Sequence, residues 1–149
     1  IQYQQTTKEE QRGTFMSENK LATCLNEGQY MQNKITAYNP EFWEAIDKLV
    51  ACSEIVIDRP KGTAHPKYPT FIYRVDYGYL KDTSSMDGAG IDVWIGSNGK
   101  SIDAIMCIVD LMKKDSEIKI LIGCTEEEKA MVYETHNETQ FMKGVLIRR

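Results

Sequence analysis

The segment YRVDYGYLKDTSSMDGAGIDVWIG, residues 73–96, decides the fold class of this chain. In it, an aromatic-rich strand pattern leads into a short acidic, glycine-rich loop, and a second strand pattern follows. Asp87 and Asp92 are five positions apart, with Gly88 and Gly90 between them. Glycine lets a loop fold tightly around an ion or phosphate, and carboxylates suit a hard cation such as Mg²⁺. Because basic residues occur on both sides of the segment, we expect it to handle phosphates.

Short strand patterns continue on both sides of this segment, separated by turn signals. Asn98-Gly99 is a strong hairpin signal. The predicted strands are residues 54–58, 71–80, 91–95, 102–111 and 117–122, with a closing strand at 145–147. At least five short strands of this kind are typical of a small barrel.

Two helices are predicted beside these strands. Asn39-Pro40 can begin one of them, and Phe42, Ile46 and Leu49 then form an apolar face. The other follows the capping box at Thr125–Glu128 and runs to about residue 135. The sequence therefore predicts an α+β fold that is mainly β, a small barrel with flanking helices.

The composition excludes several classes of protein. The chain has 149 residues, 42% hydrophobic and 27% charged, as in an ordinary globular domain. Its net charge of −4 disfavours a nucleic-acid partner. No apolar run approaches the ~20 residues needed to cross a bilayer, and the N-terminal residues lack the apolar core of a secretory signal. The four cysteines form no CxxC pair, which favours free thiols in the reducing cytoplasm.

Residues 1–34 differ from the rest because they are rich in polar side chains and show little apolar periodicity. Such a segment buries too little surface to offset its ordering entropy. We interpret residues 1–34 as a polar extension, either flexible or added artificially, and residues 35–149 as the folded domain.

Four pieces of the sequence together resemble soluble family I inorganic pyrophosphatases, with this chain as a short, divergent member. The pieces read IDRPKGTAHPKY, YRVDYGYL, MDGAGIDVW and KKDSEIKILIG, and they span roughly residues 54–124. The resemblance implies a five-stranded barrel of the oligonucleotide/oligosaccharide-binding (OB) type with a helix packed against it. It also implies Mg²⁺-dependent hydrolysis of pyrophosphate to two phosphates, with Mn²⁺ as a substitute metal. A homo-oligomer is compatible with such a protein.

The resemblance also assigns metal ligands. Asp87 and Asp92 match loop aspartates that bind metal and take part in catalysis, and Asp58 matches an acid of the outer metal shell. Asp115 and Glu117 are the candidates for the acidic ligands of the later strand pair.

Three further residues match groups on the phosphate side of the family's site. Lys119 matches a phosphate-holding lysine, and Lys67 and Tyr77 match other substrate-binding groups. Tyr77 is also expected to act in catalysis, together with the loop aspartates.

The chain departs from the family pattern at the acid that helps to activate water, where Ala89 has no carboxylate. Loss of one general base typically costs about 10²–10⁴-fold in rate. Asp76 or His136 is a hypothetical substitute base. A hairpin that carries a phosphate-binding arginine is also missing, and His136-Asn137 replaces the expected Tyr-Lys pair.

The leading interpretation is therefore an inorganic diphosphatase that turns over slowly. A non-catalytic phosphate- or nucleotide-binding protein on the same fold is the first alternative. The second is a protein-interaction module that has kept the fold and lost the site.

Overall fold

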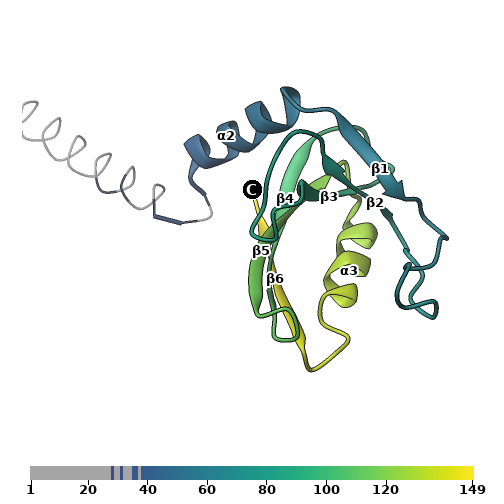
Figure 1. Cartoon of the computed structure of the whole chain (residues 1–149). Helices are drawn as coiled ribbons and strands as arrows, with labels where there is room; N and C mark the ends of the chain where they lie inside the picture. The colour runs from purple at the N-terminus through teal and green to yellow at the C-terminus, as the bar shows by residue number, and fades with distance from the viewer. Residues whose placement is uncertain (1–27, 29–30, 32–34, 37) are drawn as a thin grey trace, which may run out of the picture. The chain divides into compact units, whose positions relative to one another are not determined.

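The computed structural model describes residues 28, 31, 35–36 and 38–149 (Figure 1). The predicted extension over residues 1–34 lies outside the described residues, apart from Gly28 and Met31. The chain divides into two compact units, Ile1–Glu41 and Phe42–Arg149. The second unit contains all of the sheet and is the subject of the following description.

The second unit is built on a single sheet of six strands. In space their order is β1-β2-β3-β5-β4-β6, and neighbours are antiparallel except for the parallel pair β3 and β5. The strands are β1 (Ile55–Arg59), β2 (Asp76–Leu80), β3 (Ile91–Ile95), β4 (Ile102–Asp110), β5 (Asp115–Ile122) and β6 (Met142–Arg148).

The helices are α2 (Pro40–Ala51) and α3 (Glu126–Thr135). The predicted capping box is present, because Thr125 accepts from the Glu128 amide while the Glu128 side chain accepts from the Thr125 amide. The expected fold, mainly β with flanking helices, is confirmed. The sheet has six strands instead of five, and in the described part of the chain no pairing joins β1 to β6 to close a barrel.

Two apolar clusters form the core on opposite faces of the sheet. Successive residues of a strand point to opposite faces, so Val93 belongs to the cluster that contains Trp43 and Ile46 of α2, whereas Trp94 belongs to the cluster that contains Val132 of α3. Figure 1 shows α3 against one face of the curved sheet. The face with α3 also carries the polar residues of the candidate site.

The predicted apolar face of α2 is only partly correct. Ile46 is buried, but Phe42 and Leu49 are 38% and 37% exposed, and the most deeply buried residue of the helix is Trp43. The sheet meets the side of the helix that carries the large indole, because burying that ring removes the most apolar surface from water.

The predicted strand 71–80 is shorter in the structure, where β2 begins at Asp76. Residues 60–72 instead form a loop that folds back on itself, with the Tyr73 carbonyl accepting from Gly62 and the Tyr73 amide donating to Thr63. Gly78 has no room for a side chain, because an added Cβ would collide with the Val56 carbonyl of β1. This close approach fixes β1 beside β2 and places the loop next to the site.

Candidate functional site

The centre of the site is the ammonium group of Lys119, which lies almost entirely out of solvent. Its Nζ lies 2.5 Å from Asp92 Oδ2, 2.7 Å from Glu117 Oε1 and 2.8 Å from Tyr77 Oη. The Lys119 side chain is 6% exposed, and those of Asp92 and Glu117 are 23% and 10% exposed. The three donors of the ammonium are thus satisfied by three partners.

Strand pairing explains why these side chains meet. The parallel register pairs Val93 with Ile120, so the preceding residues, Asp92 and Lys119, are neighbours across β3 and β5. Glu117 precedes Lys119 by two positions and therefore points to the same face. Tyr77 is paired with Trp94 on β2 and β3, which brings its hydroxyl to that face as well.

An aromatic wall supports this cluster from behind. The Tyr77 ring meets Trp94 edge-on at 4.6 Å and stacks on Tyr73 at 5.4 Å between centroids. Burial, followed by the nearby Asp92 carboxylate, raises the pKa of Tyr77 well above its ordinary value. The Tyr77 hydroxyl therefore stays protonated and can act as a hydrogen-bond donor.

His136 belongs to this wall and is not available as a base. The Trp94 indole donates to its Nε2 at 3.1 Å, and its Nδ1 lies 3.3 Å from Met142 Sδ. Burial, and then the charge of Lys119, lowers the pKa of His136 to about 3. The imidazole is thus neutral at pH 7, with its accepting nitrogen occupied, which argues against the hypothesis that His136 is a substitute base.

Asp76, the other hypothetical base, already accepts a hydrogen bond from the protein backbone. Its Oδ1 accepts a hydrogen bond from the Lys61 amide at 2.7 Å. The carboxylate thus anchors the start of the loop over residues 60–72 to β2. This contact gives Asp76 a structural role that the sequence did not indicate.

Asp87 lies in an exposed loop between β2 and β3. Its Oδ1 accepts from Ser85 Oγ at 2.9 Å and from the Ala89 amide at 3.0 Å. These two hydrogen bonds lower the pKa of Asp87, and the charges of Lys113 and Lys119 lower it further despite some desolvation. The carboxylate is therefore ionised at neutral pH, and its charge lies within reach of the Lys119 cluster.

The predicted metal ligands do not gather into one preformed cage. Asp92 and Glu117 share the Lys119 ammonium, whereas Asp58 pairs with Arg59 at 2.8 Å and Asp115 lies opposite Asp110 at the start of β5. Among the described residues, no three His, Cys, Asp or Glu side chains form a group that could hold a metal ion. The structure thus joins one pair of the predicted carboxylates and leaves the others apart.

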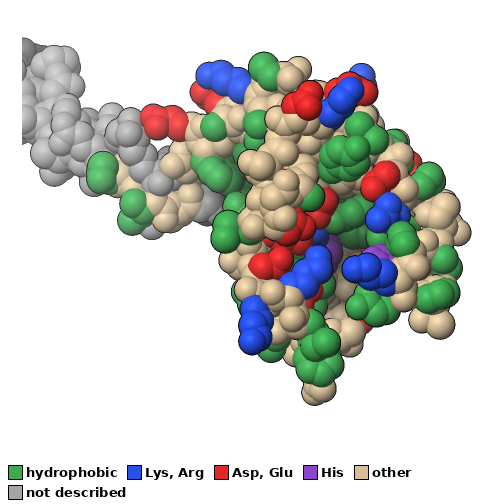
Figure 2. Space-filling view, in the orientation of Figure 1, with side chains coloured by type: hydrophobic (Ala, Val, Ile, Leu, Met, Phe, Trp, Pro, Cys, Tyr) green, Lys and Arg blue, Asp and Glu red, His purple; other side chains and the backbone are tan. Residues whose placement is uncertain are grey.

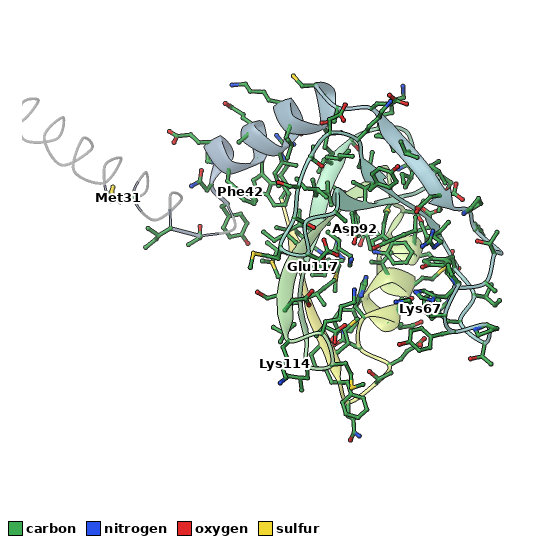
Figure 3. The ribbon with its side chains drawn as sticks, viewed as in Figure 1. Met31, Phe42, Lys67, Asp92, Lys114 and Glu117 are labelled. Carbon is green, nitrogen blue, oxygen red and sulfur yellow. The ribbon has the colours of Figure 1, made fainter. Side chains whose placement is uncertain are left out.

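A lysine of the loop over residues 60–72, Lys67, lies on the other side of the hollow from this cluster (Figure 3). Figure 3 shows Asp92 and Glu117 close together, with Lys67 across from them. In Figure 2, acidic and basic side chains gather around a hollow in which histidine is visible. The arrangement separates a largely acidic side from a basic side, as binding a phosphate together with a cation would require.

The residues that the sequence did not single out are those of the support. The sequence alone places Tyr73 and Trp94 only within predicted strands. The one available signal was the density of aromatic residues in segment 73–96.

An apolar groove of about 970 Å³ provides the main contrast to this polar site. It is lined mainly by apolar residues of α2 and of β3 to β6, and Ser85 of the loop before β3 and Glu117 of the Lys119 cluster also border it. An apolar lining does not suit a highly charged phosphate compound. The Lys119 cluster and the hollow beside it are therefore the candidate site.

A comparison with protein families matches the inorganic pyrophosphatase family model to residues 48–147 of this chain. The chain belongs to the inorganic pyrophosphatase family. The match confirms the resemblance and extends it beyond residue 124 through α3 and most of β6. The pyrophosphatase-like segment thus includes His136 and the strand that carries Met142.

A comparison with solved structures matches an inorganic pyrophosphatase from Helicobacter pylori. It is 12% identical, with a TM-score of 0.48, and the match covers 64% of this chain and 83% of that one. An inorganic phosphatase from Anaplasma phagocytophilum is 12% identical, with a TM-score of 0.39 and coverage of 63% and 78%. No curated protein sequence is significantly similar to this pyrophosphatase-family chain. None of its described helices is long and apolar enough to cross a membrane.

Proposed function

We propose that this chain binds inorganic pyrophosphate with Mg²⁺ at the Lys119 cluster and hydrolyses it slowly to two phosphates. One observation carries the proposal: the Lys119 ammonium is held out of solvent between two carboxylates and a tyrosine hydroxyl. Membership of the inorganic pyrophosphatase family supports the choice of substrate.

The charge of the cluster supports a requirement for a divalent cation. One ammonium and two carboxylates sum to −1, and Asp87 adds a further negative charge nearby. Pyrophosphate is a polyanion, so these acids repel it unless a cation lies between them. The ligand chemistry fits, because Mg²⁺ in proteins is usually bound by one or two carboxylates together with substrate phosphates. Asp92 and Glu117 would hold the ion, and Mn²⁺ could replace it.

The other side chains then have distinct roles. When bound, Mg²⁺ neutralises phosphate oxygens and lowers the pKa of bound water. With Asp92 and Glu117 turned to the ion, Lys119 would be released from them and would donate a charge-assisted hydrogen bond to a phosphate oxygen, and the protonated Tyr77 hydroxyl would donate a second one. Lys67 supplies positive charge from the opposite side of the hollow. These contacts orient the substrate without requiring it to enter the apolar core.

Slow turnover follows because none of the three described candidates, Ala89, Asp76 and His136, offers a positioned base. Ala89 offers only its amide, which donates to Asp87. His136 is neutral and bonded to Trp94, and Asp76 accepts from Lys61. Without general-base assistance the rate is expected to be about 10²–10⁴-fold lower than with it. The same observation favours the alternative function, a non-catalytic phosphate- or nucleotide-binding protein.

Phosphate release from pyrophosphate, measured with and without Mg²⁺, tests the proposal. We expect slow release that requires Mg²⁺ and is abolished in Asp92→Asn. Asp103→Asn is the matched control, because Asp103 forms the same kind of ion pair with Lys129, away from the site. Calorimetric binding without any release would support the alternative function. If the wild-type chain neither binds pyrophosphate nor releases phosphate from it, the proposed function and the alternative function are both wrong.

We also infer a cytoplasmic location. The described cysteines, Cys52, Cys107 and Cys124, are free thiols. Burial raises the pKa of Cys107 and, to about 12, that of Cys124. Inert, protonated thiols of this kind are typical of a reducing compartment.

A further inference from the structure

Four aromatic rings form a continuous series from the candidate site into the loop over residues 60–72. The Tyr77 ring stacks on that of Tyr73, with 5.4 Å between centroids. Tyr73 stacks in turn on His65 at 6.1 Å, with 18° between the ring planes. The His65 ring then lies 5.0 Å from that of Tyr68. Tyr68 therefore ends a row of packed rings, and the hydroxyl of Tyr77 at the other end contacts the Lys119 ammonium.

The two ends of this ring series differ in their exposure to solvent. Tyr73 is 5% exposed, whereas Tyr68 is 64% exposed. Tyr68 packs against His65 and otherwise leaves most of its surface in water. A flat ring that stacks on Tyr68 would remove apolar surface of both rings from water. The outer end of the ring series is thus a platform on which an aromatic group can stack.

Hydrogen bonds hold the backbone of Tyr68 in place. Its carbonyl accepts from the Phe71 amide at 2.9 Å, which closes a β-turn with Pro69 at the position that favours proline. The His65 amide donates to the Phe71 carbonyl at 2.9 Å, and the Lys67 amide donates to His65 Nδ1 at 3.0 Å. A platform that is already ordered loses little conformational freedom when a ligand binds.

The same loop carries a positive charge beside this platform. Lys67 directly precedes Tyr68 and lies across the hollow from Asp92 and Glu117 (Figure 3). Among the residues that the structure describes, the Lys67 ammonium takes part in no ion pair. In Figure 2, side chains of the hydrophobic class, which includes tyrosine, lie beside basic ones at the rim of the hollow. The loop thus combines an aromatic surface with an uncompensated charge, as a ligand with a flat ring and an anionic group requires.

We propose that the site also binds nucleoside diphosphates, with the base stacked on Tyr68 and the diphosphate between Lys67 and the Lys119 cluster with its cation. This inference rests on the proposed function and deepens it, because the diphosphate takes the place of pyrophosphate. The sugar separates the base from the diphosphate, as the ring series separates Tyr68 from Tyr77. The net charge of −4 disfavours a nucleic-acid polymer, which leaves the small nucleotide as the ligand.

Calorimetric titration with ADP and with pyrophosphate, both in the presence of Mg²⁺, tests this inference. The measured quantity is the ratio of the two dissociation constants. We expect Tyr68→Ala to shift this ratio against ADP by about 5-fold or more, as for loss of one stacking contact with a base. Tyr68→Phe, which keeps the ring, should retain the wild-type ratio. Tyr133→Ala is the matched control, because Tyr133 is an exposed tyrosine of α3 outside the ring series.

Competition shows whether the two ligands share the site. Excess pyrophosphate should displace ADP from the wild-type chain, because both diphosphates require the Lys119 cluster. The inference is wrong, and the proposed function stands, if the wild type binds pyrophosphate but not ADP, or if the two bind without competing. An unchanged ratio in Tyr68→Ala, or equal shifts in the alanine and phenylalanine variants, would contradict stacking on Tyr68. A wild-type chain that binds neither ligand would overturn this inference and the proposed function together.

Discussion

The second unit contains two buried lysines that are each bound by two carboxylates, and they differ in what surrounds them. Lys119 is 6% exposed and Lys129 is 4% exposed, and each ammonium lies within 2.8 Å of both partners. The acids of Lys119 are themselves largely buried, whereas Asp103 and Glu126 are 46% and 69% exposed.

The Lys129 cluster is part of a surface network. Glu126 also pairs with Arg148 of β6 at 2.7 Å, so its charges tie α3 to the edge of the sheet. In the described part of the chain, no second cation pairs with the acids of the Lys119 cluster, but Lys119 has Tyr77 as a third partner and an aromatic wall behind it. A buried lysine between two acids is therefore not sufficient to indicate a site. The burial of the acids and the hollow beside them make the difference.

Replacing each lysine in turn should give the largest difference in activity and stability between the two clusters. We expect Lys119→Met to reduce phosphate release by at least about 10²-fold, as for loss of a preorganised donor. It should also lower the free energy of unfolding by about 3–5 kcal/mol, because two buried carboxylates lose their counter-charge. Lys129→Met should cost only about 1 kcal/mol, because its acids remain hydrated.

Release assays and urea denaturation of both lysine variants measure these effects. Activity in Lys129→Met should stay near that of the wild type. If the two variants lost similar activity and similar stability, the distinction between a functional and a structural cluster would be wrong.

Adding a carboxylate beside each cluster should change the rate of phosphate release at only one of them. Ala89 is exposed in the loop next to Asp87, and Ala89→Asp places an acid where the family's water-activating group is expected. The rate constant for release should rise, by up to about 10²-fold. Ala130→Asp, at an exposed position of α3 beside Lys129, is the control and should leave the rate unchanged. An unaltered rate in Ala89→Asp would show that the missing acid does not limit turnover.

The wall behind Lys119 should have the smallest effect at pH 7, where His136 is mostly neutral in both the folded and the unfolded chain, and should change stability only as the pH falls. The unfolded chain binds a proton at His136 near pH 6.5, and the folded chain does so only near pH 3. The unfolded state therefore binds more protons in this range, and the free energy of unfolding falls as the pH drops from 6.5 towards 3.

This contribution amounts to about 1.4 kcal/mol per pH unit. His136→Gln, which retains an acceptor for the Trp94 indole, should remove it. Urea denaturation at pH 7, 5 and 4 compares the two proteins. If the free energies of unfolding of the wild type and His136→Gln change with pH in the same way, His136 is not buried as a neutral group.

Much of the fold could be predicted from local patterns. The Thr125–Glu128 capping box begins a helix through contacts within one turn, and strand alternation around Val93 is a property of consecutive residues. The limits of strand β2 could not be predicted, because the loop over residues 60–72 is held by hydrogen bonds to Tyr73 and by the Asp76–Lys61 contact. Such contacts depend on how distant segments pack.

By itself, the sequence determined the strand and helix types, the family, and the presence of Asp92, Tyr77 and Lys119 as candidate site residues. The tertiary structure alone decided which of the candidates meet. The parallel pairing of β3 with β5 brings Asp92 beside Lys119 from 27 residues away. This approach is not encoded in a local pattern, because it depends on a chain crossover whose loop-closure entropy is offset only by the packing of the whole sheet.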